Sequence, residues 1–129
     1  MDVGTPAEIS DEGRQSYAAD VAQVCQAFQS RGGTCILATY PLCGVVSDQL
    51  PHDRATGYNR LRAAQVVANQ LIRWTGTSLG LAVLDFEYLV EIPRDWSLET
   101  CNDAVHPSVA VHHRMAESVA TTLFPLATP

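Results

Sequence analysis

The alternation of helical and strand-like patterns is the feature that most constrains the fold of this chain. Apolar residues recur with helical spacing over residues 11–31 and 58–74, and again in a segment that Pro107 opens. Between them, short apolar runs at residues 35–40 and 81–86 are typical of buried strands. Strands that alternate with helices of this length favour parallel pairing through helical crossovers. We therefore predict an α/β fold with a parallel sheet that helices cover on both faces.

Glycine and proline residues suggest where these elements end. Gly32 should stop the first helix, Gly76 the second and Pro125 the last. Residues 42–57 contain Gly, Pro, Ser, Asp and His without periodicity, so we expect a long loop after the first strand. Because no repeat or linker interrupts the pattern, we predict a single domain over residues 1–129.

Composition limits the possible partners. A content of 47% hydrophobic and 17% charged residues fits a domain with a real core. The 8 basic and 14 acidic residues give a net charge of -6, and the arginines are scattered, which argues against nucleic acid. No apolar run approaches the roughly 18 residues of a membrane span, and the first residues lack the basic and apolar regions of a signal peptide. We expect no membrane partner and no signal peptide, with the cytoplasm as the default location.

Asp103 and His106 are the residues that most suggest chemistry. In open parallel sheets, sites lie beyond the carboxyl ends of the strands, and here residues 40–57 and 86–106 follow those ends. A histidine can take the proton of a nucleophile while a carboxylate holds its other ring nitrogen and offsets the developing charge. The spacing alone also fits a helix-capping aspartate beside a surface histidine.

The residues around this pair resemble the last sequence block of the SGNH (GDSL-type) hydrolases, which reads Asp-x-x-His-Pro and continues into a helix. Residues 103–108 read Asp-Ala-Val-His-Pro-Ser, and residues 112–117 read His-His-Arg-Met-Ala-Glu. Upstream, a strand that ends in Pro41, a helix that Tyr58 and Asn59 open and a strand that ends at Asp85 follow the order of that family's C-terminal half.

The resemblance implies a three-layer α/β/α flavodoxin-like parallel sheet, here in a partial or minimal version. It also implies hydrolysis of a small-molecule ester by a Ser-Asp-His triad, without a metal or another cofactor. Asp103 and His106 would be the catalytic carboxylate and base.

The chain departs from the family pattern in its N-terminal part. No Gly-Asp-Ser nucleophile block is present, and the nearest string, at residues 47–50, reads Ser-Asp-Gln-Leu. Pro6 stands where the family has an asparagine that helps to bind the oxyanion, and proline offers neither a side-chain amide nor a backbone N–H. The nucleophile therefore remains unidentified.

Two other kinds of nucleophile are conceivable. Residues 76–80 read Gly-Thr-Ser-Leu-Gly, but Ser78 would follow a helix and precede a strand, the reverse of a nucleophile elbow, so we interpret this stretch as an ordinary turn. Cys43 and Cys101 both belong to the segments after the strands. They could supply a thiolate, form a disulfide or remain as unpaired apolar side chains. Together with Cys25 and Cys35, they match no zinc-ligand pattern and are too few to indicate a disulfide scaffold.

The remaining histidines give weaker signals. His112 and His113 are neighbours on a helix and would point about 100° apart, so a shared metal is not expected. His52, beside Asp53, could contact a substrate, although simple exposure explains it as well.

Two strands with three helices make half of a doubly wound domain and would leave a strand edge uncovered. We expect a second copy of the chain, in a homo-oligomer, to cover this edge. The alternatives are a partner chain or a longer natural protein. We expect an SGNH-like esterase or acyl hydrolase. The alternative is a non-catalytic SGNH-derived binding or assembly module, and a cysteine-based transferase is a third class.

Overall fold

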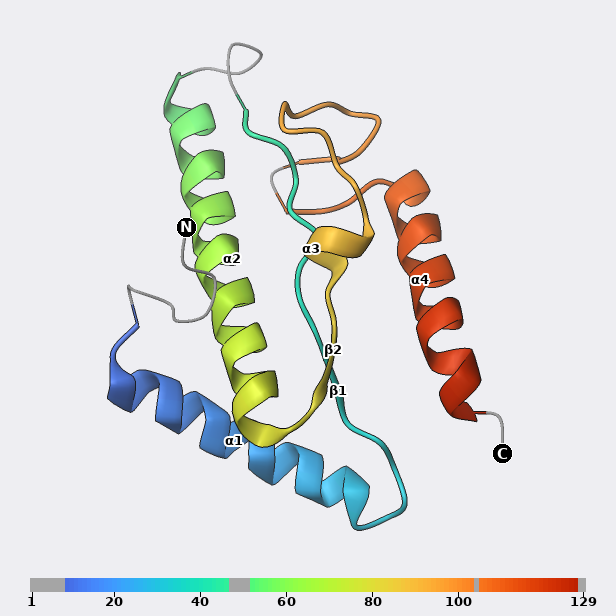
Figure 1. Ribbon diagram of the computed structural model, residues 1–129. Coiled ribbons are helices and arrows are strands. Elements are labelled where there is room, and N and C mark those ends of the chain that lie inside the picture. The colour runs from blue at the N-terminus through green and yellow to red at the C-terminus, as the bar shows by residue number, and fades with distance from the viewer. Residues whose placement is uncertain (1–8, 47–51, 104, 128–129) are drawn as a thin grey trace. The chain divides into compact units, whose positions relative to one another are not determined.

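The computed structural model describes residues 9–46, 52–103 and 105–127. Its elements are α1 (Asp11–Gln29), β1 (Ile36–Ala38), α2 (His52–Leu79), β2 (Ala82–Leu84), α3 (Phe86–Leu89) and α4 (Val109–Ala127), shown in Figure 1. The chain divides into two compact units. The first comprises Met1–Thr39 with Val67–Leu84, and the second comprises Tyr40–Val66 with Asp85–Pro129. Each unit is described by itself below.

The expected three-layer flavodoxin-like fold is wrong. The described chain is mostly helical, and its named strands form a two-stranded parallel sheet. The register pairs Ile36 with Ala82 and Ala38 with Leu84, so the parallel pairing inferred from the alternation is correct. The sheet has two strands of three residues each, which is too narrow for helices to cover as separate layers. Local apolar patterning indicates that strands exist but carries no information about how many of them assemble.

Helix α1 has the end signals that its sequence suggests. The Ser10 hydroxyl accepts a hydrogen bond from the Gly13 N–H at 3.0 Å and caps the first turn. At the other end Gly32 has a φ of 84°, and the Gly33 N–H donates to the Phe28 carbonyl at 2.9 Å. This is the Schellman arrangement that glycine favours. A disulfide between Cys25 and Cys35 then joins α1 to the residue before β1.

Helix α2 is longer than predicted at both ends. It begins at His52, inside the segment expected to be a loop, and it passes Gly76 to end at Leu79. A Cβ at Gly76 would lie 2.4 Å from Cγ2 of Val83, so this glycine permits close packing of the helix on β2. The true end is at Gly80, whose φ is 67°, where the Leu81 N–H donates to the Gly76 carbonyl at 2.9 Å.

The later boundaries also differ from those expected. Strand β2 stops at Leu84, and Phe86, predicted as its last residue, begins α3 instead. Helix α4 continues past Pro125 to Ala127. Within the second unit, α3 contacts α4 (Figure 1). None of the helices in the described ranges is both long and apolar enough to cross a membrane.

Candidate active site

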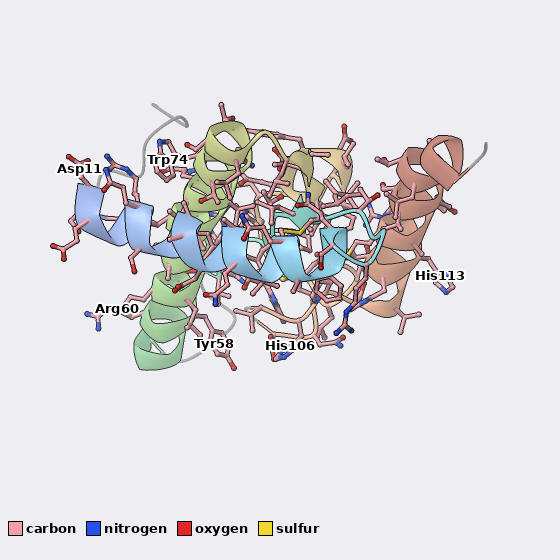
Figure 2. The ribbon with its side chains drawn as sticks, turned by 90° about the horizontal axis from the view of Figure 1, so that it is seen from below. Asp11, Tyr58, Arg60, Trp74, His106 and His113 are labelled. Carbon is pink, nitrogen blue, oxygen red and sulfur yellow. A yellow bond between two sulfur atoms is a disulfide. The ribbon has the colours of Figure 1, made fainter. Side chains whose placement is uncertain are left out.

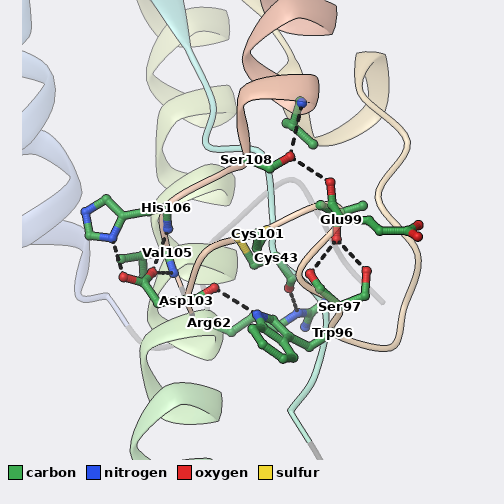
Figure 3. Close-up of a disulfide and its surroundings, with 12 residues drawn as sticks. Cys43, Arg62, Trp96, Ser97, Glu99, Cys101, Asp103, Val105, His106 and Ser108 are labelled. Atoms are coloured by element: carbon green, nitrogen blue, oxygen red, sulfur yellow. Dashed lines mark hydrogen bonds and ion pairs between the residues drawn. A yellow bond between two sulfur atoms is a disulfide. The ribbon is translucent and has the colours of Figure 1, made fainter.

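Asp103 and His106 form a hydrogen-bonded pair in the second unit, on a turn that precedes α4. Oδ2 of Asp103 lies 2.6 Å from Nδ1 of His106 (Figure 3). Oδ1 of the same carboxylate accepts the backbone N–H groups of Val105 at 2.8 Å and of His106 at 2.9 Å. The carboxylate therefore fixes both the local backbone and the imidazole ring. The sequence predicted that Asp103 and His106 lie together, and the structure shows this contact. Their catalytic role stays a prediction.

The electrostatics of the pair favour a charged carboxylate. The N–H of Val105 lowers the pKa of Asp103 most. Burial, the second-largest effect, opposes it, and the ring and N–H of His106 lower the pKa further, so that the net shift is downward. Because an ionised carboxylate can only accept hydrogen bonds, Nδ1 of His106 carries the proton in this contact. In the neutral imidazole, this leaves the lone pair on the other ring nitrogen, Nε2. The His106 side chain is 71% exposed, so a substrate or another chain can reach it.

The ends of the turn are held by backbone pairing. Cys101 and Pro107 form an isolated antiparallel bridge, in which the Asn102 N–H donates to the His106 carbonyl at 2.8 Å. The next bond along runs from the Ser108 N–H to the Thr100 carbonyl, also at 2.8 Å. These bonds close the turn that carries the pair and lead the chain directly into α4.

A disulfide between Cys43 and Cys101 lies at the base of this turn (Figure 3). Both residues are fully buried. Of the three states that the sequence left open, the structure has the bonded one, so neither cysteine offers a thiolate here. The bond ties the segment after β1 to the segment after β2.

The segment after β1 is held by further contacts. Val45 forms a parallel bridge with Asp95. Gly44 lies so close to the backbone of Asp95 that a Cβ on Gly44 would be 2.5 Å from the Asp95 carbonyl carbon. From α2, the Asn59 side chain accepts from the Val46 N–H at 3.0 Å and donates to the Val46 carbonyl at 2.9 Å. These contacts connect α2 to the same site region.

Besides the contacts of Asn59, sequence reasoning missed two side chains that support the site. Arg62 of α2 donates from Nε to the Cys43 carbonyl at 2.8 Å. Trp96 donates from its indole Nε1 to the Asp103 carbonyl at 3.0 Å. Neither residue belongs to a recognisable motif, because each reaches a backbone carbonyl that only the folded chain brings close.

The nearby serines are engaged elsewhere. The Ser108 hydroxyl donates to the Glu99 carbonyl at 2.8 Å, and the Ser97 hydroxyl lies 3.3 Å from Oγ1 of Thr100. Ser78 is exposed in the last turn of α2 and belongs to the first unit, whereas His106 belongs to the second.

Several other candidates can be placed only in part. Ser47 and Asp48, and Pro6 with its neighbours, lie outside the described residues. His52 is the first residue of α2. His112 and His113 are exposed on α4, and Figure 2 shows His113 at the surface. Within the described ranges, no group of three or more His, Cys, Asp or Glu side chains is placed to hold a metal ion.

Comparisons with protein-family models, with curated proteins and with solved structures find no significant match to this chain. The likeness to SGNH hydrolases thus rests on the sequence blocks around Asp103 and His106 and remains a prediction.

Proposed function

We propose that this chain provides the acid–base pair of an SGNH-like esterase or acyl hydrolase, with His106 as base and Asp103 as its orienting carboxylate. The observation that carries the proposal is the 2.6 Å contact between Oδ2 of Asp103 and Nδ1 of His106 on an exposed turn. Such a contact fixes the imidazole orientation that leaves Nε2 free to take a proton.

The proposed chemistry is acyl transfer through a serine supplied from outside this chain. Nε2 of His106 takes the serine hydroxyl proton as the serine oxygen bonds to the ester carbonyl carbon. The carboxylate of Asp103 stabilises the resulting imidazolium. His106 then returns the proton to the leaving alcohol as the ester C–O bond breaks. In the second half of the cycle, His106 takes a proton from water as the water oxygen bonds to the acyl carbon. It then returns this proton to the serine oxygen as the acyl–serine bond breaks. No metal or other cofactor takes part in this scheme.

Hydrolysis of 4-nitrophenyl acetate by the full chain tests the proposal. This activated ester suits the test because a well-oriented imidazole can attack it without a serine. We expect His106→Ala to abolish turnover above the buffer rate. His113→Ala, which removes an exposed histidine from α4, should leave the rate unchanged. Equal rates for wild type and His106→Ala would place any hydrolysis elsewhere.

A non-catalytic SGNH-derived binding or assembly module is the second candidate. It is favoured by the engagement of the Ser97 and Ser108 hydroxyls and by the disulfide that occupies Cys43 and Cys101. Such a module should show neither labelling by a fluorophosphonate probe nor ester hydrolysis. Stoichiometric labelling of a serine in the purified chain would contradict it.

We further propose that the chain associates with a second copy. The two-stranded sheet and two exposed apolar side chains on α1, Val24 at 57% and Phe28 at 61%, support this. Sedimentation equilibrium should show a dimer or larger oligomer that Phe28→Ser weakens. Leu98→Ser, at a 70% exposed position in the second unit, is the control. A stable monomer at micromolar concentration would contradict the proposal.

A further inference from the structure

Trp96 makes a contact that the local geometry of the turn does not require. The hydrogen bonds of the Asp103 carboxylate all lead to Val105 and His106, within the same turn. They fix the shape of the turn but cannot fix where it lies against the rest of the unit. The bond from Nε1 of Trp96 to the Asp103 carbonyl, at 3.0 Å, comes from a separate segment (Figure 3).

The segment that carries Trp96 is itself anchored. The Trp96 N–H donates to the Val45 carbonyl at 3.1 Å, and the Val45 N–H donates to the Arg94 carbonyl at 2.7 Å. Val45 lies two residues from Cys43, which the disulfide joins to Cys101. The indole is half-buried, so its hydrogen bond is only partly open to competition from water.

We propose that Trp96 is a positioning residue for the Asp103–His106 pair, whose indole N–H holds the Asp103 backbone so that the carboxylate meets Nδ1 of His106. Trp96 matters for catalysis only if the proposed function holds, and to that extent the inference rests on it. Its structural part, the effect of one N–H on the pair, can be measured without any activity.

Two variants separate the N–H from the bulk of the ring. Trp96→Phe removes the donor and part of the ring. Replacement of Trp96 by β-(3-benzothienyl)-L-alanine exchanges the N–H for sulfur and keeps the two-ring shape. Trp74→Phe is the matched control, because Trp74 belongs to the first unit and packs under the Arg14 guanidinium, 5.4 Å from its ring centre.

The readout is the tautomer of His106 by ¹⁵N NMR in the full, oxidised chain. We expect the wild type to show the Nδ1–H form that the contact with Asp103 favours. Both Trp96 replacements should lower the ratio of Nδ1–H to Nε2–H forms by about 2- to 10-fold, the range that the loss of one hydrogen bond allows. Trp74→Phe should leave the ratio unchanged.

The possible outcomes are distinct. An unchanged ratio in the benzothienyl variant would overturn the proposal, as would its unfolding, which would show that the N–H holds the fold rather than the pair. If the ratio falls as expected while the wild type hydrolyses no ester, the positioning role stands and the proposed function fails. If the wild type is active, kcat should fall in the same order as the tautomer ratio.

Discussion

Cys43 and Cys101 are joined by a disulfide although 58 positions separate them in the sequence. One follows β1 and the other follows β2, so the bond connects the two segments that leave the same end of the parallel sheet. Because Cys101 is two residues before Asp103, the bond also anchors the turn that carries the acid–base pair. The fold and the candidate site therefore depend on a common covalent link.

Removal of this disulfide should cost more stability than removal of the other one. Loop-closure entropy predicts a loss of about 4 kcal/mol for the pair Cys43→Ala and Cys101→Ala, against about 3 kcal/mol for Cys25→Ala and Cys35→Ala, whose separation is 10 positions. Urea unfolding of the two double variants measures the difference. A larger loss from the Cys25–Cys35 pair would contradict this account.

Gly44 should not tolerate a methyl group. A Cβ there would lie 2.5 Å from the backbone of Asp95 and Trp96, so Gly44→Ala must displace one segment from the other, and we expect a loss of about 1–3 kcal/mol. Gly57→Ala is the control, since Gly57 lies in α2 with open space around it. That change should stabilise the chain by about 0.5–1 kcal/mol. Thermal unfolding of both variants should give shifts of opposite sign.

The two hydrogen bonds between the Asn59 side chain and the Val46 backbone should contribute to stability. Val46 is buried, so Asn59→Ala leaves its N–H and carbonyl without these partners and should cost about 1–3 kcal/mol. Arg60→Ala, at the next and exposed position of α2, should change stability by less than about 0.5 kcal/mol. Equal effects of the two substitutions in urea unfolding would show that the contact is unimportant.

Acid should weaken the fold partly through Asp103. The pKa of this carboxyl is lowered in the folded chain from its ordinary value of 3.8. The contribution of Asp103 to the free energy of unfolding is therefore complete at a pH above the pKa of the unfolded chain. It is lost as the pH falls through the lower pKa of the folded chain. The free energy of unfolding should therefore fall less steeply below pH 3.8 in Asp103→Asn than in the wild type. Parallel pH profiles of the two proteins would show that the carboxyl is not stabilised by its turn.

Part of the fold could be predicted because its signals are local. The apolar spacing over residues 11–31 predicted α1, and the alternation of patterns predicted two parallel strands. Gly76 was misread because a glycine can end a helix or permit close packing, and only its neighbour Val83 distinguishes the two. The three-layer flavodoxin-like architecture was wrong because the assembly of strands and helices into layers depends on contacts distant in sequence.

The candidate site also combines contacts that the sequence could predict with contacts that it could not. Asp103 and His106 meet because three positions on one turn bring them together, which spacing can suggest. The contributions of Asn59 and Trp96 could not be predicted, since each side chain binds a backbone group 13 or 7 positions away in a segment without periodicity. The sequence left a Cys43–Cys101 disulfide as one of three alternatives, and only the folded chain decides among them. The Cys25–Cys35 bond was not predicted.

The central claim is that Asp103 orients His106 for acid–base chemistry. The most direct test is kcat/KM for 4-nitrophenyl acetate in Asp103→Asn relative to the wild type, with both proteins shown to be folded and oxidised. An asparagine amide would present a donor to Nδ1 and favour the wrong tautomer of His106. We predict a loss of at least about 100-fold, within the range of general acid–base catalysis. An Asp103→Asn protein that retains the wild-type kcat/KM would contradict the account.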